Sequence, residues 1–588
     1  MAIWFAVLAL PLAVLSFALI DVNRASVEKR HLQDALDAAT LLAARSTAKN
    51  TAEVQPIGAA ALTAQLSGMS AATVTSSVFT VDGSKIIGAA TAKVTPVIAN
   101  LWLGGDMTVH ANSEVTRAST NLEVALVLDV TGSMYGSKMT DMKTAAKDLI
   151  DMVVSDVQSP YYSKAALVPF SLGVNAGSYA ASVRGPVVGT KAISGASWQV
   201  GATKNISGIS KSNNRLTVTS NGHGFANGDY VYISGVNGMT QVNNRVFVVS
   251  NRNNNTFRLS GISSSGYSNY SWGGTIRECR ASDCSMVIDA NAHGYANGEL
   301  VYITGVQGMT QLNGQTYTVA NPTTNAFSLA GTDGPNGGFG AYSSGGTAYC
   351  LVEGCEYYRF TDTGWNTRRW QISSCVTERT DPEAQRYTDA AAAANPVGRL
   401  YLADTSDCPG ASIVPLSSDK TALKNAITNF QAEGSTAGQI GTAWGWYMVS
   451  PNFSPSGAPL WPSGSQPAAY TAPNTLKVVV IMTDGEFNTT YCNGVLARNS
   501  GYSGTRINCD AENGDGTVQA QTVCTAMKDA GVVVYTVGFA LGGNATAETF
   551  VRDCATSSAN VYLPSGGGAL KDAFAAIGRD IMKLRLSK

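Results

Sequence analysis

The chain has 588 residues, several times the usual size of one domain, so we expect several folded units. Its 40 Lys and Arg residues balance its 41 Asp and Glu residues, and the sequence contains no basic stripe, which argues against a nucleic-acid partner. Glycine is abundant and charged residues are few, a balance typical of folded, secreted, β-rich proteins.

The first apolar segment, Ala2–Ile20, carries no charge and is nearly long enough to cross a bilayer. A small-residue cleavage pattern does not follow it. The chain continues instead with helical spacing, at Val22, Ala25, Lys29, Leu32, Leu36, Ala39 and Ala43. We therefore expect residues 1–50 to form a retained transmembrane anchor and an amphipathic helix. By the positive-inside rule, basic residues next to a membrane span lie on the cytoplasmic side. The basic residues here follow the span, which argues against a C-terminal part outside the cytoplasm: Arg24, Lys29 and Arg30.

Short alternating runs follow between Ala72 and Ser119, with a turn at Asp82-Gly83. They predict a small β-rich unit over residues 51–120. Its sequence carries no residue pattern of catalytic or binding chemistry.

A long apolar run, Leu122–Leu128, ends abruptly in Asp129-Val-Thr-Gly-Ser133. Such a run without alternation is typical of a strand buried on both faces of a parallel sheet. Helical spacing follows at Met142, Ala146, Leu149 and Val153. The first part of a strand-loop-helix domain is therefore predicted over residues 121–198, with Ala165–Ser171 as its second strand.

The same alternation returns in the C-terminal part, residues 350–588. Two more apolar strands are predicted at Leu476–Met482 and Gly531–Gly538, with a helix at Val518–Ala530 and a closing amphipathic helix at Leu570–Leu584. We predict an α/β fold with a doubly wound, mostly parallel sheet.

Oxygen-bearing side chains follow two of these strands. Asp129, Thr131 and Ser133 come after the first and Asp484 after another, while Thr436 lies on the Gly434–Gly438 loop before a helix that carries Trp444 and Trp446. Ligands bind at the carboxyl edge of such sheets, so we expect these side chains to converge. Taken singly, each motif is more often a turn or a helix cap.

Together, Asp129, Thr131, Ser133, Thr436 and Asp484 resemble the metal-ion-dependent adhesion site of von Willebrand factor A-type domains. Thr131 stands where many members have serine, which keeps the hydroxyl. The resemblance implies that the hydroxyls of Thr131, Ser133 and Thr436 contact the metal, and that the two carboxylates act largely through water.

The residue types suit a hard divalent cation such as Mg²⁺, which takes about six oxygen ligands. Two carboxylates offset its charge, and neutral hydroxyls leave it electrophilic. A partner protein's Asp or Glu can fill an open position. We therefore expect a binding protein that is not an enzyme.

An enzymatic alternative exists. Asp129–Ser133 also resembles the aspartyl-nucleophile loop of haloacid dehalogenases and P-type ATPases, which would make the chain a Mg²⁺-dependent phosphohydrolase. Thr131 stands where those phosphatases need a second Asp, and Val130 stands where the ATPases need Lys. The four histidines lie far from these positions in the sequence: His31, His110, His223 and His293.

All ten cysteines lie beyond residue 278, and none forms a Cys-x-x-Cys pair, so disulfides are favoured over zinc. Short intervals favour Cys279–Cys284 and Cys350–Cys355. For the rest we expect Cys375–Cys408, Cys492–Cys509 and Cys524–Cys554, although spacing alone leaves other pairings open.

Residues 222–260 and 292–330 are two copies of one sequence. Alternating residues and glycine turns predict a small β module for each copy. The copies resemble the first catalytic cysteine half-domain of ubiquitin-activating enzymes, which implies a fold and not ubiquitin chemistry. We expect His223 and His293 to stabilise turns, and the pair to form an insertion at residues 199–349 that interrupts the A-type domain.

The whole layout resembles the TadG family of bacterial Flp (tight-adherence) pilus-assembly proteins. Leu32–Ala43 looks like the TadE/TadG-type N-terminal region, and Val168–Ser171, Cys375–Arg379 and Gly441–Trp446 resemble its A domain. The resemblance implies an inner-membrane anchor, a periplasmic or extracellular C-terminal domain, and pilus or secretion-machinery proteins as partners in assembling or anchoring a pilus. A direct surface adhesin that uses the same metal site is the alternative.

Overall fold

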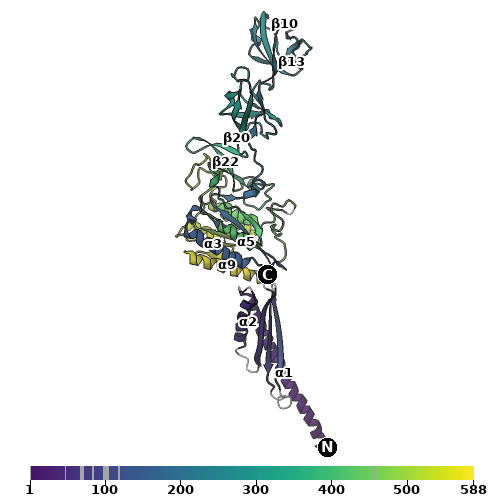
Figure 1. The fold of residues 1–588 in the computed structure, drawn as a ribbon, viewed down its shortest axis with the longest axis vertical. Helices are drawn as coiled ribbons and strands as arrows, with labels where there is room; N and C mark the ends of the chain where they lie inside the picture. Colours follow the sequence, from purple (N-terminus) through teal and green to yellow (C-terminus); the bar gives the residue numbers. More distant parts are fainter. Residues whose placement is uncertain are drawn as a thin grey trace.

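The computed structural model shows an elongated molecule. The N-terminal helix, a three-stranded sheet, a large α/β domain and two β modules follow one another along its long axis (Figure 1). The described residues are 2–46, 48, 50–66, 72–82, 85–96, 105–116, 120–159, 161–455 and 457–587, without the side chains of residues 2–15, 17, 586 and 587.

Helix α1 (Ala2–Ala44) runs from the N-terminus into the first folded unit. Its C-terminal half buries Leu32, Leu36, Ala39 and Ala43 fully, in agreement with the predicted amphipathic spacing. Within the described residues, no helix combines the length and the apolar content that crossing a membrane requires. Most side chains of the predicted anchor segment Ala2–Ile20 lie outside the described part.

The first unit combines α1 with helix α2 (Thr51–Gln65) and an antiparallel sheet of β1 (Ala72–Asp82), β2 (Lys85–Val94) and β3 (Met107–Thr116). Helix α2 was not predicted. Asn50 starts it, because its side chain accepts a hydrogen bond from Glu53 N and donates one to Glu53 Oε1. Phe79 of β1 is fully buried in this unit. Gly83, of the predicted turn, lies outside the described residues.

The α/β domain is built on a ten-stranded sheet whose main path is β21-β22-β6-β5-β4-β25-β28-β29. Five neighbours pair in parallel: β5 (Ser163–Phe170), β4 (Asn121–Asp129), β25 (Thr475–Thr483), β28 (Val533–Gly538) and β29 (Val561–Tyr562). Strand β4 lies between β5 and β25, so the chain first adds β5 on one side of β4 and later adds β25 and β28 on the other side. The strand order therefore reverses between β4 and β25.

The remaining strands of this sheet pair antiparallel. They are β6 (Val174–Asn175), β21 (Tyr357–Thr361), β22 (Thr367–Thr377), β23 (Gly398–Leu402) and β24 (Val414–Ser417). The predicted α/β fold is confirmed, but the prediction that its sheet is mostly parallel is wrong, because only the five core strands pair in parallel and the other five pair antiparallel. Strands that follow each other through short turns pair antiparallel, and such strands make up the other sheets.

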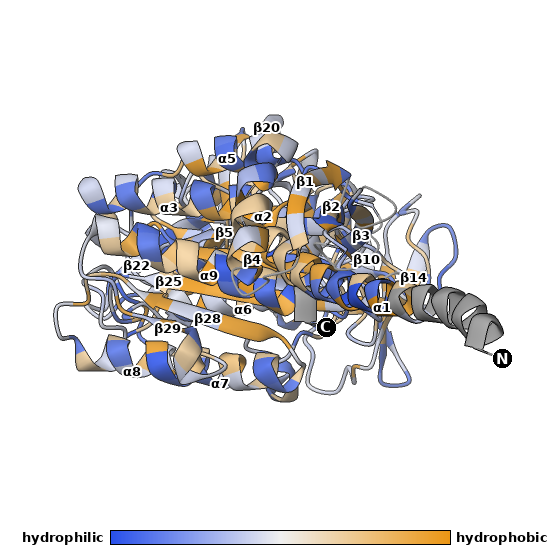
Figure 2. Cartoon of the chain, turned by 90° about the horizontal axis from the view of Figure 1, so that it is seen from below, coloured by the Kyte–Doolittle hydropathy of each residue, from blue (hydrophilic) through white to orange (hydrophobic). Residues whose placement is uncertain are grey.

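Helices cover both faces of the parallel strands. One face packs against α3 (Ser137–Val153), α5 (Lys420–Thr428) and α9 (Gly567–Ser587), and the other against α6 (Gly438–Val449), α7 (Gly516–Asp529) and α8 (Ala545–Cys554). Alternate residues of β4 point to the two faces, Leu126 to one and Val127 to the other. Figure 2 shows these apolar strands between α3 and α9 on one side and α7 and α8 on the other.

Gly445 allows α6 to approach β4 closely. A Cβ added at this position would overlap Val127 Cγ2, so a larger residue would push the helix away from the sheet. The short elements α4 (Ala180–Arg184), β26 (Tyr491–Cys492) and β27 (Val495–Leu496) complete the domain.

The inserted copies fold as two seven-stranded antiparallel sheets. The first contains β9 (Gln199–Asn205), β10 (Gly208–Ser212), β11 (Arg215–Thr219), β12 (Tyr230–Asn237), β13 (Arg245–Ser250), β14 (Thr256–Ser260) and β15 (Trp272–Cys279). The second contains β7 (Lys191–Ala192), β8 (Gly195–Ser197), β16 (Val287–Asp289), β17 (Leu300–Gln307), β18 (Gln315–Ala320), β19 (Ala326–Leu329) and β20 (Ser344–Cys350).

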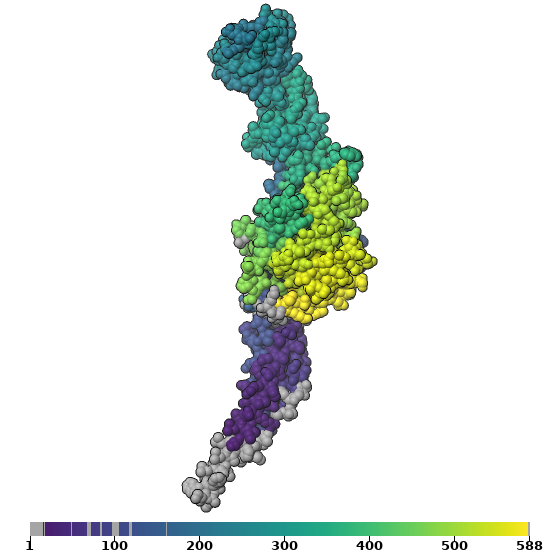
Figure 3. All heavy atoms as spheres, turned by 180° about the vertical axis from the view of Figure 1, so that it is seen from behind, coloured from purple at the N-terminus to yellow at the C-terminus, as the bar shows by residue number. Residues whose placement is uncertain are grey.

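The predicted limits of the insertion, 199 and 349, cut into the second module. Strand β8 pairs with β16 and β7 with β20, although both precede residue 199, and β20 continues to Cys350. The chain thus completes the second module with strands from both sides of the first. Figure 3 shows the first module at the far end of the molecule and the second next to the α/β domain.

All ten cysteines form disulfides, and all five predicted pairings are confirmed: Cys279–Cys284, Cys350–Cys355, Cys375–Cys408, Cys492–Cys509 and Cys524–Cys554.

Candidate functional site

The carboxyl ends of β4 and β25 lie side by side, because the two strands pair in parallel with Leu128 opposite Met482. Asp129 ends β4, and Asp484 directly follows β25. The strand order reverses between these two strands, and in open α/β sheets that crevice is where ligands bind.

Asp129 is fully buried, and hydrogen bonds reach both of its oxygens. Its Oδ1 accepts from Thr131 N at 2.9 Å and from Thr131 Oγ1 at 2.6 Å. Its Oδ2 accepts from Thr483 Oγ1 at 2.8 Å and from Asp484 N at 3.4 Å. The carboxylate therefore fixes the turn after β4 against the end of β25.

A chain of short contacts continues from this carboxylate to the second one. Thr131 Oγ1 lies 2.8 Å from Ser133 Oγ, and Ser133 Oγ donates to Asp484 Oδ1 at 2.6 Å. The structure thus brings together Asp129, Thr131, Ser133 and Asp484, although about 350 residues separate the two motifs. Ser133 is exposed, whereas the other three are buried, so the cluster opens to solvent at Ser133.

The loop that carries Thr436 lies against the turn after β4. Gly132 N donates to Gly434 O at 3.1 Å, and Asn488 N donates to Thr436 O at 3.1 Å. Thr436 N in turn donates to Asn488 Oδ1 at 3.3 Å. The loop that carries Thr436 therefore contacts both loops that supply the other four residues. Thr436 itself is 8% exposed, and these contacts are made by the backbone of its loop.

Sequence reasoning missed three residues of this site: Lys138, Thr483 and Asn488. Lys138 Nζ forms an ion pair with Asp484 Oδ2 at 2.7 Å. Its position in the first turn of α3, just after the first motif, could have suggested it. Thr483 could have been found from its place next to Asp484, but the sequence around Asn488 carries no comparable signal.

Negative charge is concentrated here. Burial, and then the charge of Asp484, raise the pKa of Asp129 to about 6, while hydrogen bonds from Thr131 and Thr483 oppose that rise. A cation beside the two carboxylates would relieve this repulsion. Two carboxylates and three hydroxyl-bearing side chains fit a hard divalent cation, although its binding by these residues stays a prediction.

Glu299, Cys350 and Cys355 also lie close enough together to suggest a metal site. Both cysteines are joined in a disulfide, so neither offers a thiolate ligand.

The two duplicated histidines hold turns, as expected. His223 Nδ1 accepts from Phe225 N at 2.9 Å, and His293 Nδ1 accepts from Tyr295 N at 2.9 Å. Each Nε2 lies against a backbone carbonyl oxygen, of Asn253 and Ala326 respectively, which fixes the proton on Nε2.

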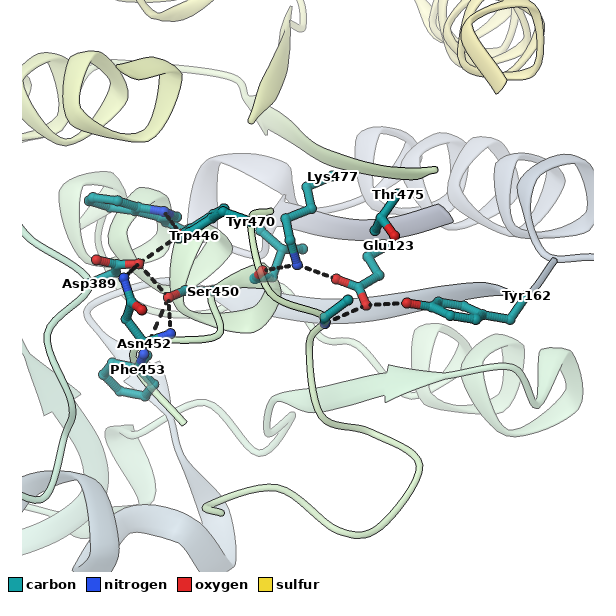
Figure 4. A network of polar contacts seen from close by, with 12 residues as sticks. Glu123, Tyr162, Asp389, Trp446, Ser450, Asn452, Phe453, Tyr470, Thr475 and Lys477 are labelled. Atoms are coloured by element: carbon teal, nitrogen blue, oxygen red, sulfur yellow. Dashed lines mark hydrogen bonds and ion pairs between the residues drawn. The ribbon is translucent and has the colours of Figure 1, made fainter. Parts of the chain in front are cut away.

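A buried polar network lies at the opposite, amino end of the same two strands (Figure 4). Glu123 of β4 forms an ion pair with Lys477 of β25, and Lys477 Nζ also donates to Val449 O at 2.8 Å. Burial lowers the pKa of Lys477, and the charge of Glu123 opposes this shift. The network therefore ties the sheet to the C-terminal end of α6, the helix that follows Thr436.

These features define an α/β domain with a cluster of carboxylate and hydroxyl side chains at the carboxyl edge of parallel strands, carrying an inserted pair of β modules. Residues 1–46 match the model of the Flp pilus-assembly TadE/G-like family. Residues 211–280 and 285–351 match the ubiquitin-activating enzyme E1 FCCH domain. Both resemblances drawn from the sequence are thus confirmed for these segments.

Among solved structures, the pilus adhesin SpaC from Lactobacillus rhamnosus GG is similar, with 9% identity and a TM-score of 0.29 over 87% of this chain. The chain spans 35% of the length of SpaC. The vWF domain of the type V pili tip protein Mfa5 from Porphyromonas gingivalis is also similar, with 8% identity and a TM-score of 0.29 over 80% of this chain and 97% of Mfa5. Among curated proteins, none matches the chain.

Proposed function

We propose that this chain is an envelope-anchored Flp pilus-assembly or pilus-anchoring protein, and that its α/β domain is a doubly wound von Willebrand A-type domain that binds a partner protein through Mg²⁺ or a similar cation. Asp129, Thr131, Ser133, Thr436 and Asp484 would hold the cation. One observation carries the proposal: oxygen-bearing side chains from the loops after β4 and β25 meet where the strand order reverses, and the backbone of the Thr436 loop packs against both of these loops.

The cluster suits binding better than catalysis. A nucleophilic aspartate must reach its substrate, but Asp129 is fully buried and both of its oxygens already accept hydrogen bonds. Ser133, by contrast, is exposed, so a cation beside it could accept a carboxylate from another protein. This arrangement disfavours the phosphohydrolase alternative.

The N-terminal match and the disulfides support the proposed position in the cell envelope. The TadE/G-like segment lies on α1, at one end of the elongated molecule (Figure 1). Five disulfides suit an oxidising compartment outside the cytoplasm. We infer that α1 anchors the chain in the bacterial inner membrane, and that the α/β domain faces the periplasm or the exterior with pilus or secretion-machinery proteins as its partners.

A direct surface adhesin is the second candidate. It is favoured by the shape, because the β modules project from the α/β domain away from the N-terminal end (Figure 3). A deletion strain separates the two candidates: loss of pili supports assembly, whereas normal pili with poor attachment supports adhesion.

The test of the cation mechanism is a pull-down of envelope proteins with the full chain and with Asp129→Ala. We expect wild-type binding to disappear in chelator and to return with Mg²⁺, and the variant to bind no partner in either condition. Asp148→Ala is the matched control, because Asp148 is a half-exposed carboxylate of α3 that pairs with Lys571. Partner binding that persists in chelator would disprove the mechanism.

A further inference from the structure

A hairpin at the border between the α/β domain and the second β module presents an exposed tryptophan. Strands β21 and β22 pair as far as Thr361 and Thr367, and residues 362–366 form the tip between them. Figure 1 shows β22 next to β20 of the second module. Trp365 in the tip is 79% exposed, although tryptophan is on average one of the well-buried residues. The hairpin therefore offers a large apolar side chain to solvent.

The backbone of Trp365 is strained. Its φ is +62°, in the left-handed region that glycine adopts freely and that bulky side chains disfavour. Because the residue is so exposed, packing within the chain does not compensate for this strain. Backbone strain of this kind concentrates at binding sites, where the strained residue meets a ligand or partner. The strain therefore indicates that Trp365 is placed for a contact outside the chain.

The tip is held in shape from inside. Asp362 is buried, and its Oδ1 accepts hydrogen bonds from Gly364 N at 2.9 Å and from Asn366 N at 2.8 Å. Its Oδ2 accepts from Arg368 Nε at 2.7 Å, and Trp365 N donates to Asp362 O at 2.9 Å. A surface that is fixed before binding loses little conformational entropy when a partner binds.

A second loop supports the tip from the side. Thr363 N donates to Arg506 O at 3.0 Å, and Asn508 N donates to Thr361 O at 3.0 Å. The disulfide Cys492–Cys509 ties this second loop to β26. The tip and the Arg506 loop therefore form one surface.

Three arginines of this surface have no carboxylate partner within the described part of the chain: Arg359, Arg369 and Arg506. Arg359 and Arg369 lie directly opposite each other on β21 and β22, where like charges repel. The guanidinium of Arg369 lies 4.7 Å from the ring centre of Tyr302, and Arg506 Nε donates to Tyr502 O at 3.1 Å. Neither contact neutralises the charge. Three carboxylates in the same segments already pair with other arginines: Asp362 with Arg368, Glu353 with Arg399, and Asp510 with Arg498.

We propose that the surface formed by Trp365, Arg359, Arg369 and Arg506 binds an acidic segment of another protein. Guanidinium groups form strong charge-assisted hydrogen bonds with carboxylates, so the positive charge selects Asp or Glu side chains. Tryptophan and arginine are also the side chains that contribute most to the binding energy of protein interfaces. Trp365 packs against the apolar part of the same segment.

A membrane or a nucleic acid fits this surface less well. The residues around Trp365 are polar or glycine, and burying them in lipid would remove their hydrogen bonds with water: Thr361, Thr363, Gly364, Asn366 and Thr367. A nucleic acid requires basic residues along an extended groove, whereas the three arginines are confined to one hairpin and its neighbouring loop.

The surface adjoins a loop of the cation site proposed above. Tyr502 N, on the Arg506 loop, donates to Asn488 O at 2.9 Å, and Asn488 N donates to Thr436 O at 3.1 Å. Tyr502 is itself 39% exposed. A partner that gives a carboxylate to the cation could therefore continue across Tyr502 to Trp365. That extension rests on the proposed function, whereas binding of an acidic segment at Trp365 does not require the cation.

The test measures fluorescence anisotropy of a fluorescein-labelled acidic peptide, three repeats of Glu-Glu-Phe-Gly, titrated with the full chain in EDTA. We expect saturable binding that weakens as salt concentration rises, because salt screens the arginine charges. Trp365→Ser and Arg359→Gln should each raise Kd about fivefold or more. Both residues are exposed, so neither replacement disturbs the core.

Trp272→Ser and Arg252→Gln are the matched controls, because both residues are exposed on the first β module, and neither change should alter the affinity. The second module has Ser344 at the position of Trp272, so that replacement suits the fold.

Three results would overturn the proposal: no saturable binding, equal binding of a peptide with Lys in place of Glu, or an affinity that neither Trp365→Ser nor Arg359→Gln changes. Phosphatidylglycerol vesicles that bind through Trp365 while the acidic peptide does not would assign the surface to a membrane, and would overturn it as well. Since EDTA removes divalent cations, the result does not depend on the Asp129–Asp484 site.

Discussion

Replacing Lys138 by methionine should strengthen cation binding at the Asp129–Asp484 site. Lys138 Nζ lies 2.7 Å from Asp484 Oδ2, on the other side of the carboxylate from Ser133. Its ammonium therefore competes with any cation for the charge of Asp484. Methionine keeps the length and the apolar part of the side chain but removes the charge.

The size of the effect follows from Coulomb's law. A divalent ion at the other Asp484 oxygen lies about 5 Å from the ammonium, and at the dielectric constant of water the repulsion is about 1.7 kcal/mol. The Lys138 side chain is 33% exposed, so screening by physiological salt reduces this to about 1 kcal/mol. The expected decrease in Kd for Mg²⁺ is thus about fivefold.

Isothermal titration of the full chain with Mg²⁺ measures this change. Lys143→Met is the matched control, since Lys143 also lies on α3 but donates to Thr428 O at 3.0 Å instead of contacting the site. The advantage of Lys138→Met should shrink as salt concentration rises. Unchanged or weaker Mg²⁺ binding by this variant would show that Lys138 does not compete with the cation.

Three further predictions concern stability and domain limits. Lys477→Met should lower the free energy of unfolding by about 3–5 kcal/mol in urea titrations, because it leaves Glu123 buried without its counter-charge. Adding Glu123→Gln to this variant should restore part of the lost stability. A single Lys477→Met variant as stable as the wild type would contradict this reasoning. In chelator, the stability of the wild type relative to Glu378→Gln should fall as the pH rises from 4.5 to about 7 and then level off, because the folded wild type keeps a proton on Glu378 that the unfolded chain has released. Urea titrations of both proteins at several pH values measure this difference. A difference in unfolding free energy that does not change with pH would refute the assigned burial of Glu378. Replacing residues 190–355 by a short linker should leave a folded α/β domain, as measured by circular dichroism. Deleting only residues 199–349 should give an unstable protein, because β7 and β8 then lose their partner strands. Equal stability of the two deletion variants would contradict the strand pairing.

Local patterns in the sequence predicted the core of the α/β domain. The apolar run before Asp129, broken only by Glu123, is typical of a strand covered on both faces, and β4 is indeed buried along nearly its whole length. The spacing of Leu570, Phe574, Ile577 and Ile581 likewise predicted α9, and all four are fully buried. These features are encoded by neighbouring residues, so periodicity suffices to find them.

Helix α2 and the limits of the insertion escaped prediction because their signals are weak or distant. The residues of α2 show little apolar periodicity, and the helix depends on its cap at Asn50 and on packing against β1. Strands β7 and β8 have two and three residues, too few to show alternation. They become strands by pairing with β20 and β16, far along the chain.

Composition and motif order in the sequence predicted the α/β class, an oxidised set of cysteines and the candidate residues Asp129, Thr131, Ser133, Thr436 and Asp484. The pairing of the cysteines was left open by their spacing and is given by the structure. Tertiary structure alone decided which other groups meet them. Lys138 reaches Asp484 because α3 begins beside the end of β25, and Glu378, Gln439 and Asn513 line the same pocket although they lie on three separate segments. Charge and hydrogen bonding act through space over a few ångströms, and sequence separation carries no information about such distances.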